Sequence, residues 1–364
     1  MANRVINFNP GPAALPLEAL ERAQRELLDF EGTGMSILEH SHRGKDYERV
    51  HVETIGLLRE LCGLSDDYQV LLLQGGASQQ FAMVPMNLLP VGRSADYVVT
   101  GAFAKKAYAE SQFIGKTRIA ATTEDADGTF RRVPKQHELQ LDPNAAYVHV
   151  CSNNTIMGTE YHVLPDTGSV PLVVDMSSDI LSQKRDFSRF GLVYAGAQKN
   201  LGPSGVAVVI ARKAWLAEGR EDIPKIFRYK EHAKENSLFN TAPTFSIYLL
   251  RNALSILKRE GGVDAIEQRN RKKAALLYGL VDENPEFFYT KVERESRSIM
   301  NPVFRLRTPE LDAKMVAEAK EAGFVGIKGH KLVGGLRISI YNWITEEQVA
   351  QFVEWARQFA RRNA

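Results

Sequence analysis

The stretch GLVYAGAQKNLGPSGVAVVIA, residues 191–211, decides the fold. Two short apolar runs, 191–197 and 206–211, flank a linker of small residues, glycine and proline in which Lys199 is the only charge. Short runs rich in β-branched residues and bounded by turn signals are typical of buried strands. Surface lysines usually lie among other polar groups, so this stretch raises the question of what an amine does between two buried strands.

The same kind of run recurs along the chain. Between several of these runs lie predicted helices, 78–89 and 103–113, and two amphipathic helices, 17–30 and 45–61, precede them. This alternation predicts an α/β fold, with a sheet covered by helices on both faces. The further strand runs are QVLLLQ (69–74), DYVVT (96–100), TRIAAT (117–122), AYVHVC (146–151) and PLVVD (171–175).

A second, smaller unit follows a helix predicted over 244–259. That helix ends at Gly261-Gly262, a natural helix stop and our candidate domain boundary. A chain of 364 residues also exceeds the size at which one core keeps growing. We therefore predict an N-terminal arm (1–15) packed with the small domain, a large domain (16–260) and a small α+β C-terminal domain (261–364). The small domain contains predicted helices over 263–283, 309–322 and 345–361 and predicted strands over 302–307 and 336–341.

Composition limits the class of protein. With 44% hydrophobic and 25% charged residues the chain is typical of soluble globular proteins, and its apolar runs are too short for a membrane span. A net charge of +2 is too mild to indicate a nucleic-acid partner. Cys62 and Cys151 provide neither a disulfide framework nor a zinc cluster, and no carboxylate cluster completes a metal site at His40 and His42. The N-terminus lacks a signal-peptide pattern, so we expect a cytoplasmic protein without membrane, nucleic acid or metal.

The strand ends deliver the candidate chemistry, because ligands of open α/β sheets bind outside the carboxyl ends of the strands. QVLLLQ ends in Gly75-Gly76-Ala77-Ser78, where glycines and free N–H groups at a helix start attract a phosphate. Alone, such a turn is more often plain strand-to-helix geometry. Neither GxGxxG nor GxxxxGK[ST] occurs, so the usual markers of hydride transfer and ATP chemistry are missing.

Asp175 and Lys199 follow two other strand runs. A carboxylate at a buried strand end needs a cationic partner, which is an arginine, a helix N-terminus or a protonated heterocyclic nitrogen. An amine in an apolar, glycine-rich setting has a lowered pKa and can form a Schiff base. Together with the phosphate-binding turn, these are the parts that hold pyridoxal 5'-phosphate: phosphate at GGAS, ring nitrogen at Asp175 and aldehyde at Lys199.

Along almost its whole length the chain resembles the phosphoserine aminotransferases, a fold-type I family that uses pyridoxal phosphate. The motifs SHRGK, FNTAPT and GHKLVGGLRISIYN are the most specific to that family, whereas DMSSD recurs more widely. The matching stretches are NFNPGPAALP (7–16), SHRGKDY (41–47), LLLQGGASQQF (71–81), NNTIMGTE (153–160), DMSSDILS (175–182), YAGAQKNLGPSG (194–205), FNTAPTFSIY (239–248) and KGHKLVGGLRISIYN (328–342).

The resemblance implies a mainly parallel seven-stranded sheet, a homodimer with active sites at the interface, and a two-step transamination of 3-phosphohydroxypyruvate by L-glutamate. O-phospho-L-serine and 2-oxoglutarate are the products, a step in serine synthesis, and 4-phosphohydroxythreonine of pyridoxine synthesis is a second substrate the family allows. It implies that Lys199 forms the internal aldimine, Asp175 holds the ring nitrogen and Thr155 contacts the ring. The cofactor phosphate is bound by Ala77, Ser78 and Gln198, and by Asn240 and Thr241 of the other subunit.

The resemblance also assigns the substrate ligands. It points to Arg337 for the α-carboxylate and to His42, Arg43, His330 and Lys331 for the distal phosphate or carboxylate. Isolated in the sequence, these residues also fit ordinary surface charges. Two positions depart from the family pattern: Phe103 stands where tryptophan usually stacks on the cofactor, and Lys331 where many members have arginine. We expect weaker stacking at the first and a point charge in place of a guanidinium fork at the second.

Two other functions remain open from the sequence. A related fold-type I transaminase or lyase of the alanine–glyoxylate kind, with a non-phosphorylated substrate, would not need the four distal cations. A non-catalytic binding protein with this fold would not need Lys199 and Asp175. A cysteine desulfurase is disfavoured, because Cys151 ends a strand and reads as a small core residue.

Overall fold

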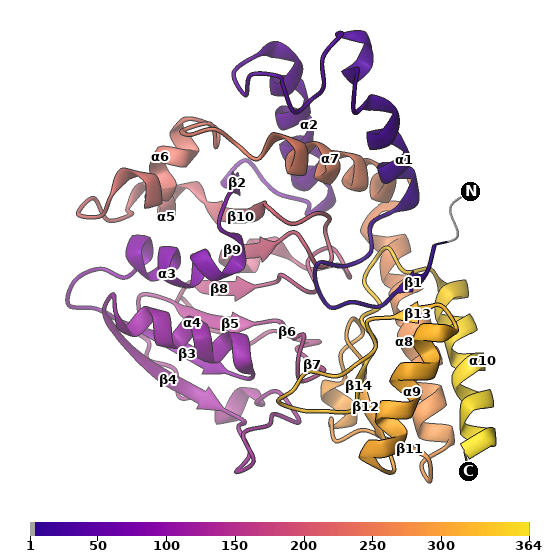
Figure 1. Ribbon diagram of the computed structural model, residues 1–364. Helices are drawn as coiled ribbons and strands as arrows, with labels where there is room; N and C mark the ends of the chain where they lie inside the picture. The colour runs from indigo at the N-terminus through magenta and orange to yellow at the C-terminus, as the bar shows by residue number, and fades with distance from the viewer. Residues whose placement is uncertain (1–3, 364) are drawn as a thin grey trace.

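The computed structural model describes residues 4–363 and has a seven-stranded sheet at its centre (Figure 1). Each strand coincides with one of the predicted apolar runs, shifted by no more than two residues at its ends. The strands are β2 (Tyr68–Leu73), β3 (Ser94–Val99), β4 (Lys116–Thr122), β5 (Val148–Cys151), β8 (Leu172–Asp175), β9 (Phe190–Gly196) and β10 (Ala207–Arg212).

The strand order across the sheet is β2-β10-β9-β8-β5-β3-β4. Neighbours from β9 to β4 pair in parallel, whereas β10 is antiparallel to both β9 and β2. The prediction of a mainly parallel α/β sheet is therefore confirmed. In this order β9, β8 and β5 are adjacent, which brings the residues that follow them to one edge of the sheet.

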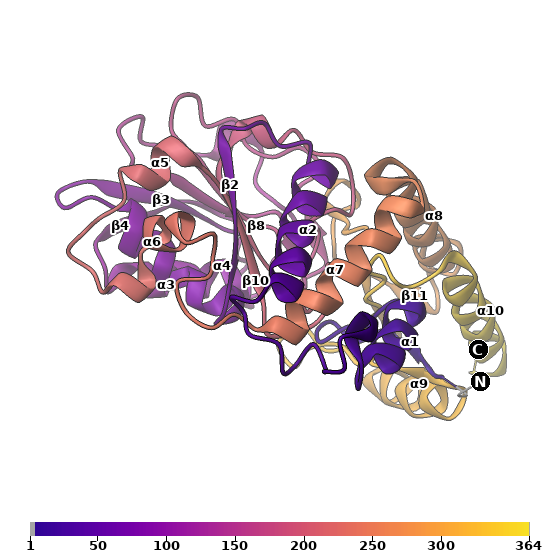
Figure 2. The same ribbon diagram turned by 90° about the horizontal axis from the view of Figure 1, so that it is seen from above.

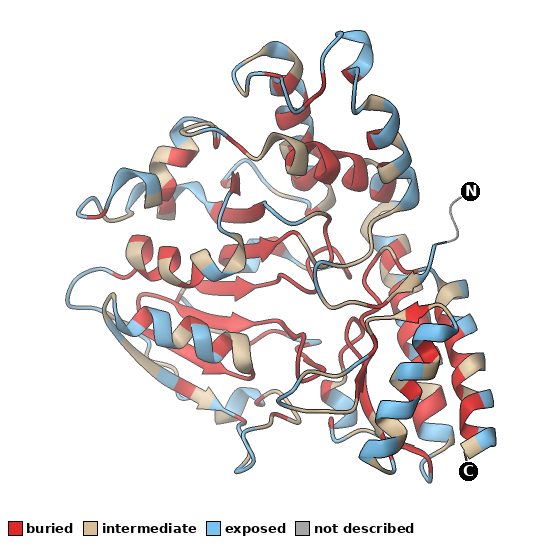
Figure 3. Cartoon of the chain, in the orientation of Figure 1, coloured by how far each residue is buried: buried red, intermediate tan, exposed pale blue. Residues whose placement is uncertain are grey.

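Helices cover both faces of the sheet, and the side chains of the strands alternate between them. In β9, Val193 and Ala195 face the apolar cluster that contains α2 and α7, while Leu192 and Tyr194 face the cluster that contains α3 and α4. Figure 2 shows α2 beside α7 on one side, and Figure 3 shows that the strands are buried while the outer helix faces are exposed. The helices of this part are α1 (Leu17–Glu26), α2 (Lys45–Leu61), α3 (Gly76–Leu88), α4 (Ala102–Gln112), α5 (Lys213–Ala217), α6 (Tyr229–Lys234) and α7 (Thr244–Arg259).

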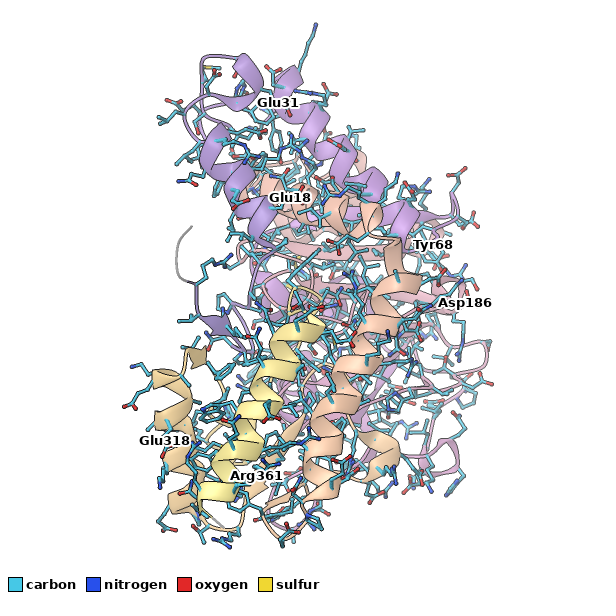
Figure 4. The ribbon with its side chains drawn as sticks, turned by 90° about the vertical axis from the view of Figure 1, so that its right-hand side faces the viewer. Glu18, Glu31, Tyr68, Asp186, Glu318 and Arg361 are labelled. Atoms are coloured by element: carbon cyan, nitrogen blue, oxygen red, sulfur yellow. The ribbon has the colours of Figure 1, made fainter. Side chains whose placement is uncertain are left out.

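The C-terminal part has a separate apolar cluster beneath α8 (Gly262–Glu283), α9 (Pro309–Glu321) and α10 (Glu346–Asn363). Helices α8 and α10 run side by side, as Figures 1 and 4 both show. The N-terminal strand β1 pairs with β13, and Phe8 lies in this cluster. The remaining strands are β1 (Ile6–Asn7), β6 (Asn153–Asn154), β7 (Thr159–Glu160), β11 (Phe288–Tyr289), β12 (Val303–Leu306), β13 (Phe324–Val325) and β14 (Leu336–Arg337). The domain boundary at 260/261 stays a prediction, although a helix break occurs there.

Two elements are each four residues shorter than predicted. The helix predicted over 17–30 ends at Glu26, because Phe30 turns inward to pack against His40 and Tyr248. The strand predicted over 336–341 is regular only for its first two residues, since Ile338 and Ile340 donate their backbone hydrogen bonds to the loop at 300–302. Within residues 4–363, no helix has both the length and the apolar character to cross a bilayer.

Candidate active site

The candidate site lies at the carboxyl edge of β5, β8 and β9. Thr155 follows β5, Asp175 ends β8, and Lys199 lies three residues beyond β9. Because these three strands are neighbours in the sheet, the fold brings the three residues together from positions that are up to 44 apart in the sequence. The sequence predicted each of them.

Lys199 is half-buried, and its Nζ donates a hydrogen bond of 2.7 Å to Thr155 Oγ1. The same nitrogen lies 4.5 Å from the centroid of the Phe103 ring. Burial lowers the pKa of Lys199, while the negative charge of Asp175 opposes the shift. The net lowering enriches the neutral amine, which is the nucleophilic form.

Asp175 is a buried carboxylate that its neighbours hold in place. Its Oδ1 accepts hydrogen bonds from the backbone N–H (2.9 Å) and the hydroxyl (2.6 Å) of Ser177, and the Ser177 hydroxyl in turn accepts from the N–H of Gly196. Burial raises the pKa of Asp175, and the charge of Lys199 and the two bonds from Ser177 oppose this. Sequence reasoning missed Ser177, although its place in the motif DMSSD was a signal.

The GGAS turn has backbone N–H groups that are free to donate hydrogen bonds to a ligand. Gly75 and Gly76 have φ angles of 81° and 62°, a left-handed conformation that glycine permits, and α3 begins at once. No acceptor within residues 4–363 binds the N–H groups of Ala77 and Ser78. A Cβ on Gly196 would lie 2.7 Å from Gln198 Oε1 and 3.3 Å from the nitrogen of Ala77, so the amide and this helix start lie close together. This cradle fits a phosphate.

Arg337 on β14 brings a buried guanidinium to the same site. Its side chain is 6% exposed, and its Nη1 donates to the carbonyl oxygen of Thr155 at 3.4 Å. Its Nε is buried with no hydrogen-bond partner, and it forms no ion pair with any described residue. A buried guanidinium without a carboxylate is costly, so this position is suited to an anionic ligand.

His330 and Lys331 lie in the loop before β14, where the carbonyl of His330 accepts from the N–H groups of Val333 and Gly334. Burial lowers the pKa of His330, and the positive charges of Arg337, Lys331 and Lys106 act in the same direction. The charges of these three cations therefore all act on the His330 imidazole. The sequence did not predict Lys106, although its spacing of three from Phe103 on a helix was a signal.

The other predicted cations lie elsewhere in the chain. His42 and Arg43 belong to the loop between α1 and α2, which Figure 1 shows far from β13 and β14. One copy of the chain thus does not bring them to His330 and Lys331.

Asn240 and Thr241 contact the residue that precedes the GGAS turn. Asn240 Nδ2 donates to Gln74 Oε1 and Gln74 Nε2 donates to the carbonyl of Thr241, both at 2.9 Å. Their role toward a second subunit stays a prediction.

The structure adds an N-terminal contact that the sequence did not indicate. The N–H of Ala13 donates to the carbonyl of Gln198 at 2.9 Å, and a Cβ on Gly11 would lie 3.1 Å from Lys199 Cγ. The arm therefore packs directly on the stem of the central lysine, and its glycine permits this approach.

Three further polar residues, Asp179, Glu160 and Ser152, had no predicted role, although the first two lie in matching stretches quoted above. Buried Asp179 accepts from Arg185 at 3.1 Å, and Glu160 lies 3.8 Å from the same guanidinium. Ser152 donates to Asp179 and lies 3.1 Å from the carbonyl of Asp175. This network joins the end of β8 to the C-terminal part, because Glu160 accepts from the N–H of Ile299.

The remaining candidates are structural. His40 is buried and lies 3.0 Å from Thr33 Oγ1 and 3.7 Å from Asp46. Burial raises the pKa of Cys151 well above its usual value, which keeps the thiol protonated. Over residues 4–363, no cluster of three or more His, Cys, Asp or Glu side chains could hold a metal.

Known aminotransferases resemble this chain in sequence and in fold. Residues 5–352 match the family model "Aminotransferase class-V". The phosphoserine aminotransferase of Halalkalibacterium halodurans is 51% identical over 98% of both chains. The solved phosphoserine aminotransferase from Bacillus circulans subsp. alkalophilus superposes with a TM-score of 0.97 at 50% identity over all of both chains. A PLP-bound phosphoserine aminotransferase from Trichomonas vaginalis gives 0.92 at 34% identity, covering 98% of this chain and all of that one. The chain belongs to the class-V aminotransferase family.

Proposed function

We propose that the chain transfers the amino group of L-glutamate to 3-phosphohydroxypyruvate, giving O-phospho-L-serine and 2-oxoglutarate in the synthesis of serine. The names of the relatives support the reaction, and the meeting of Lys199, Asp175 and Arg337 at one sheet edge is the observation that carries it. The reaction proceeds in two half-reactions, with the amino group held by the enzyme between them.

The residues fit pyridoxal 5'-phosphate. The open N–H groups of Ala77 and Ser78, with the amide of Gln198, would hold its phosphate, and the buried carboxylate of Asp175 would hold its ring nitrogen. When bound, the cofactor supplies an aldehyde that an amine attacks and a protonated ring that accepts electrons from the substrate Cα. Phe103, next to Lys199, is placed to cover the ring.

Lys199 moves the proton. With the cofactor bound, its neutral Nζ, which burial favours, would take a proton from the substrate Cα as general base and give it back as general acid. The hydroxyl of Thr155, which accepts from Nζ at 2.7 Å, holds the amine at this position. The charge of Asp175 would favour a proton on the ring nitrogen of the bound cofactor, and the two hydrogen bonds from Ser177 fix the orientation of this carboxylate.

The anion ligands set the choice of substrate. Arg337 would bind the α-carboxylate through its two-pronged guanidinium, and His330 and Lys331 would bind the distal phosphate. An alanine–glyoxylate type of substrate has no group for these distal cations, which disfavours that alternative. The 4-phosphohydroxythreonine of pyridoxine synthesis carries the same phosphate and is a second substrate of the proposal.

We also propose a homodimer in which His42 and Arg43 of one copy serve the site of the other. Support comes from their distance from β13 and β14 within one chain (Figure 1). Asn240 and Thr241 would reach the partner's cofactor phosphate in the same assembly. The cytoplasm is the proposed compartment, since both cysteines are buried and free. Native mass measurement should give a dimer, and a monomer that is fully active would contradict the shared site.

The substrate assignment is tested by absorbance. We expect the purified holoenzyme to be yellow, L-glutamate to bleach it, and O-phospho-L-serine to bleach it at far lower concentration than L-serine. The ratio of the two half-saturating concentrations measures the contribution of the phosphate. Equal responses to O-phospho-L-serine and L-serine would overturn the phosphate assignment, and a protein that gains no absorbance with added pyridoxal phosphate would overturn the cofactor.

A further inference from the structure

Lys106 borders the candidate site through a shared aromatic ring. Helix α4 carries Phe103 and Lys106 one turn apart, and Lys106 Nζ lies 5.5 Å from the centroid of the Phe103 ring. The same ring has Lys199 Nζ at 4.5 Å from its centroid. Lys106 is exposed, so its long side chain is free to move toward the site from this position.

The loop before β14 and the start of α4 pack against the same apolar cluster. Val333 contacts the same apolar cluster as Ala102 and Phe103. The charge of Lys106 reaches His330 in that loop, where it adds to those of Arg337 and Lys331 in lowering the pKa of the imidazole. Two elements that lie more than 200 residues apart thus share an apolar cluster and carry cations that act on one imidazole.

No acid compensates these cations. Among residues 4–363, neither Lys106, His330, Lys331 nor Arg337 has a carboxylate within the 4.0 Å that defines an ion pair. The adjacent Lys105, by contrast, pairs with Glu124 at 2.5 Å. Neighbouring cations without a counter-charge repel one another, and a bound anion removes that cost.

We propose that Lys106 is a specificity-determining residue that binds the distal phosphate of the substrate together with His330 and Lys331. The proposal rests on the proposed function and names a further ligand for it. A phosphate dianion gains more from an added cation than a carboxylate does, so Lys106 favours the phosphorylated substrate over L-glutamate. Lys106 also supplies a positive charge in addition to that of Lys331, whose ammonium is a point charge and not a guanidinium fork.

The test compares Lys106→Gln, Lys106→Arg and the matched control Lys105→Gln in the holoenzyme. We expect Lys106→Gln to raise the KM for O-phospho-L-serine about fivefold and that for L-glutamate about twofold, with kcat nearly unchanged. Lys106→Arg should restore most of the affinity, and Lys105→Gln should match the wild type. Inhibition by inorganic phosphate, measured at low and high salt, should weaken in Lys106→Gln and become less dependent on salt.

Several outcomes would show that Lys106 does not bind the distal phosphate. Unchanged KM values in Lys106→Gln, equal effects on both substrates, or the same loss in Lys105→Gln would overturn the proposal. So would a fall in cofactor affinity without a change in phosphate inhibition, because Lys106 would then only support Phe103. If the wild type itself does not prefer O-phospho-L-serine over L-serine, the proposed function fails. If it does and Lys106→Gln behaves like the wild type, only this inference fails.

Discussion

Two inward-facing lysines, Lys199 at the sheet edge and Lys273 on α8, differ in what surrounds the amine. Lys273 is fully buried, and its Nζ donates to the carbonyls of Ile340, Tyr341 and Ile344, each at 2.9 Å. Lys199 is half-buried and has one hydrogen-bond acceptor, Thr155 Oγ1. Burial lowers the pKa of both side chains.

The comparison shows that burial does not mark a reactive lysine. Three carbonyls match the three donors of an ammonium, so at Lys273 the hydrogen-bonding capacity of the amine is used within the protein. At Lys199, the Nζ has one hydroxyl acceptor and lies 4.5 Å from the centroid of a ring, which leaves the amine available. Lys273 thus ties the chain after β14 to α8, while Lys199 is placed to react.

The largest expected effect separates the two lysines by rate. Lys199→Ala should lower the rate of transamination by at least about 10³-fold, because it removes both the covalent anchor and the proton carrier. Lys273→Met should keep its rate per folded molecule within a few-fold of the wild type. Stopped-flow absorbance with O-phospho-L-serine measures both, and comparable losses in the two variants would break the distinction.

The second-largest expected effect is a difference in the free energy of unfolding between variants of the two lysines. Lys273→Met should lower the free energy of unfolding by about 3 kcal/mol, since it leaves the buried carbonyls of Ile340 and Ile344 without a donor and removes one of the two donors of Tyr341. Lys199→Ala without cofactor should change it far less, because the amine has one hydroxyl partner. Urea unfolding of the cofactor-free proteins provides the comparison, and a larger loss in Lys199→Ala would contradict it.

A third prediction concerns Asp179, the buried acid that pairs with Arg185 near the end of β8. Burial raises the pKa of Asp179 above 3.8, with Glu160 adding to the shift and Arg185 opposing it. Between 3.8, the pKa of an unperturbed Asp, and the raised pKa in the folded state, the folded protein binds more protons than the unfolded chain. The free energy of unfolding therefore falls as the pH rises from about 4 toward neutral. Asp179→Asn should make this decline shallower. Urea midpoints across that range measure the slope, and an unchanged slope would show that Asp179 does not titrate there.

The smallest expected effect concerns the Phe103 ring beside Lys199. Phe103→Trp should lower the dissociation constant of pyridoxal phosphate about threefold, because the larger ring provides more stacking area. Equilibrium dialysis against the wild type gives the ratio. Weaker binding in the variant would mean that the pocket is shaped for phenylalanine and cannot take the indole.

The sequence predicted the sheet and the residues at its edge for a physical reason. Buried parallel strands form continuous apolar runs, so Asp175 and Lys199 were visible as charges at the ends of such runs. Lys273 was hidden, because it lies in a charged helical stretch, RNRKKAALL, where one more lysine carries no signal. Ser177 lies two residues from Asp175 and Lys106 lies three from Phe103, so both had a local signal. Their neighbours Gly196 and His330 come from other parts of the chain, which local patterns do not encode. The end of the first helix depended on the inward turn of Phe30, a tertiary contact.

Borohydride reduction of the yellow holoenzyme, followed by digestion and peptide mass analysis, tests the central claim most directly. The claim is that Lys199 holds the cofactor while Lys273, although more deeply buried, does not react. We predict the added cofactor mass on the peptide that contains Lys199 and an unmodified peptide that contains Lys273. Cofactor mass on any other lysine, or on none, would contradict the account.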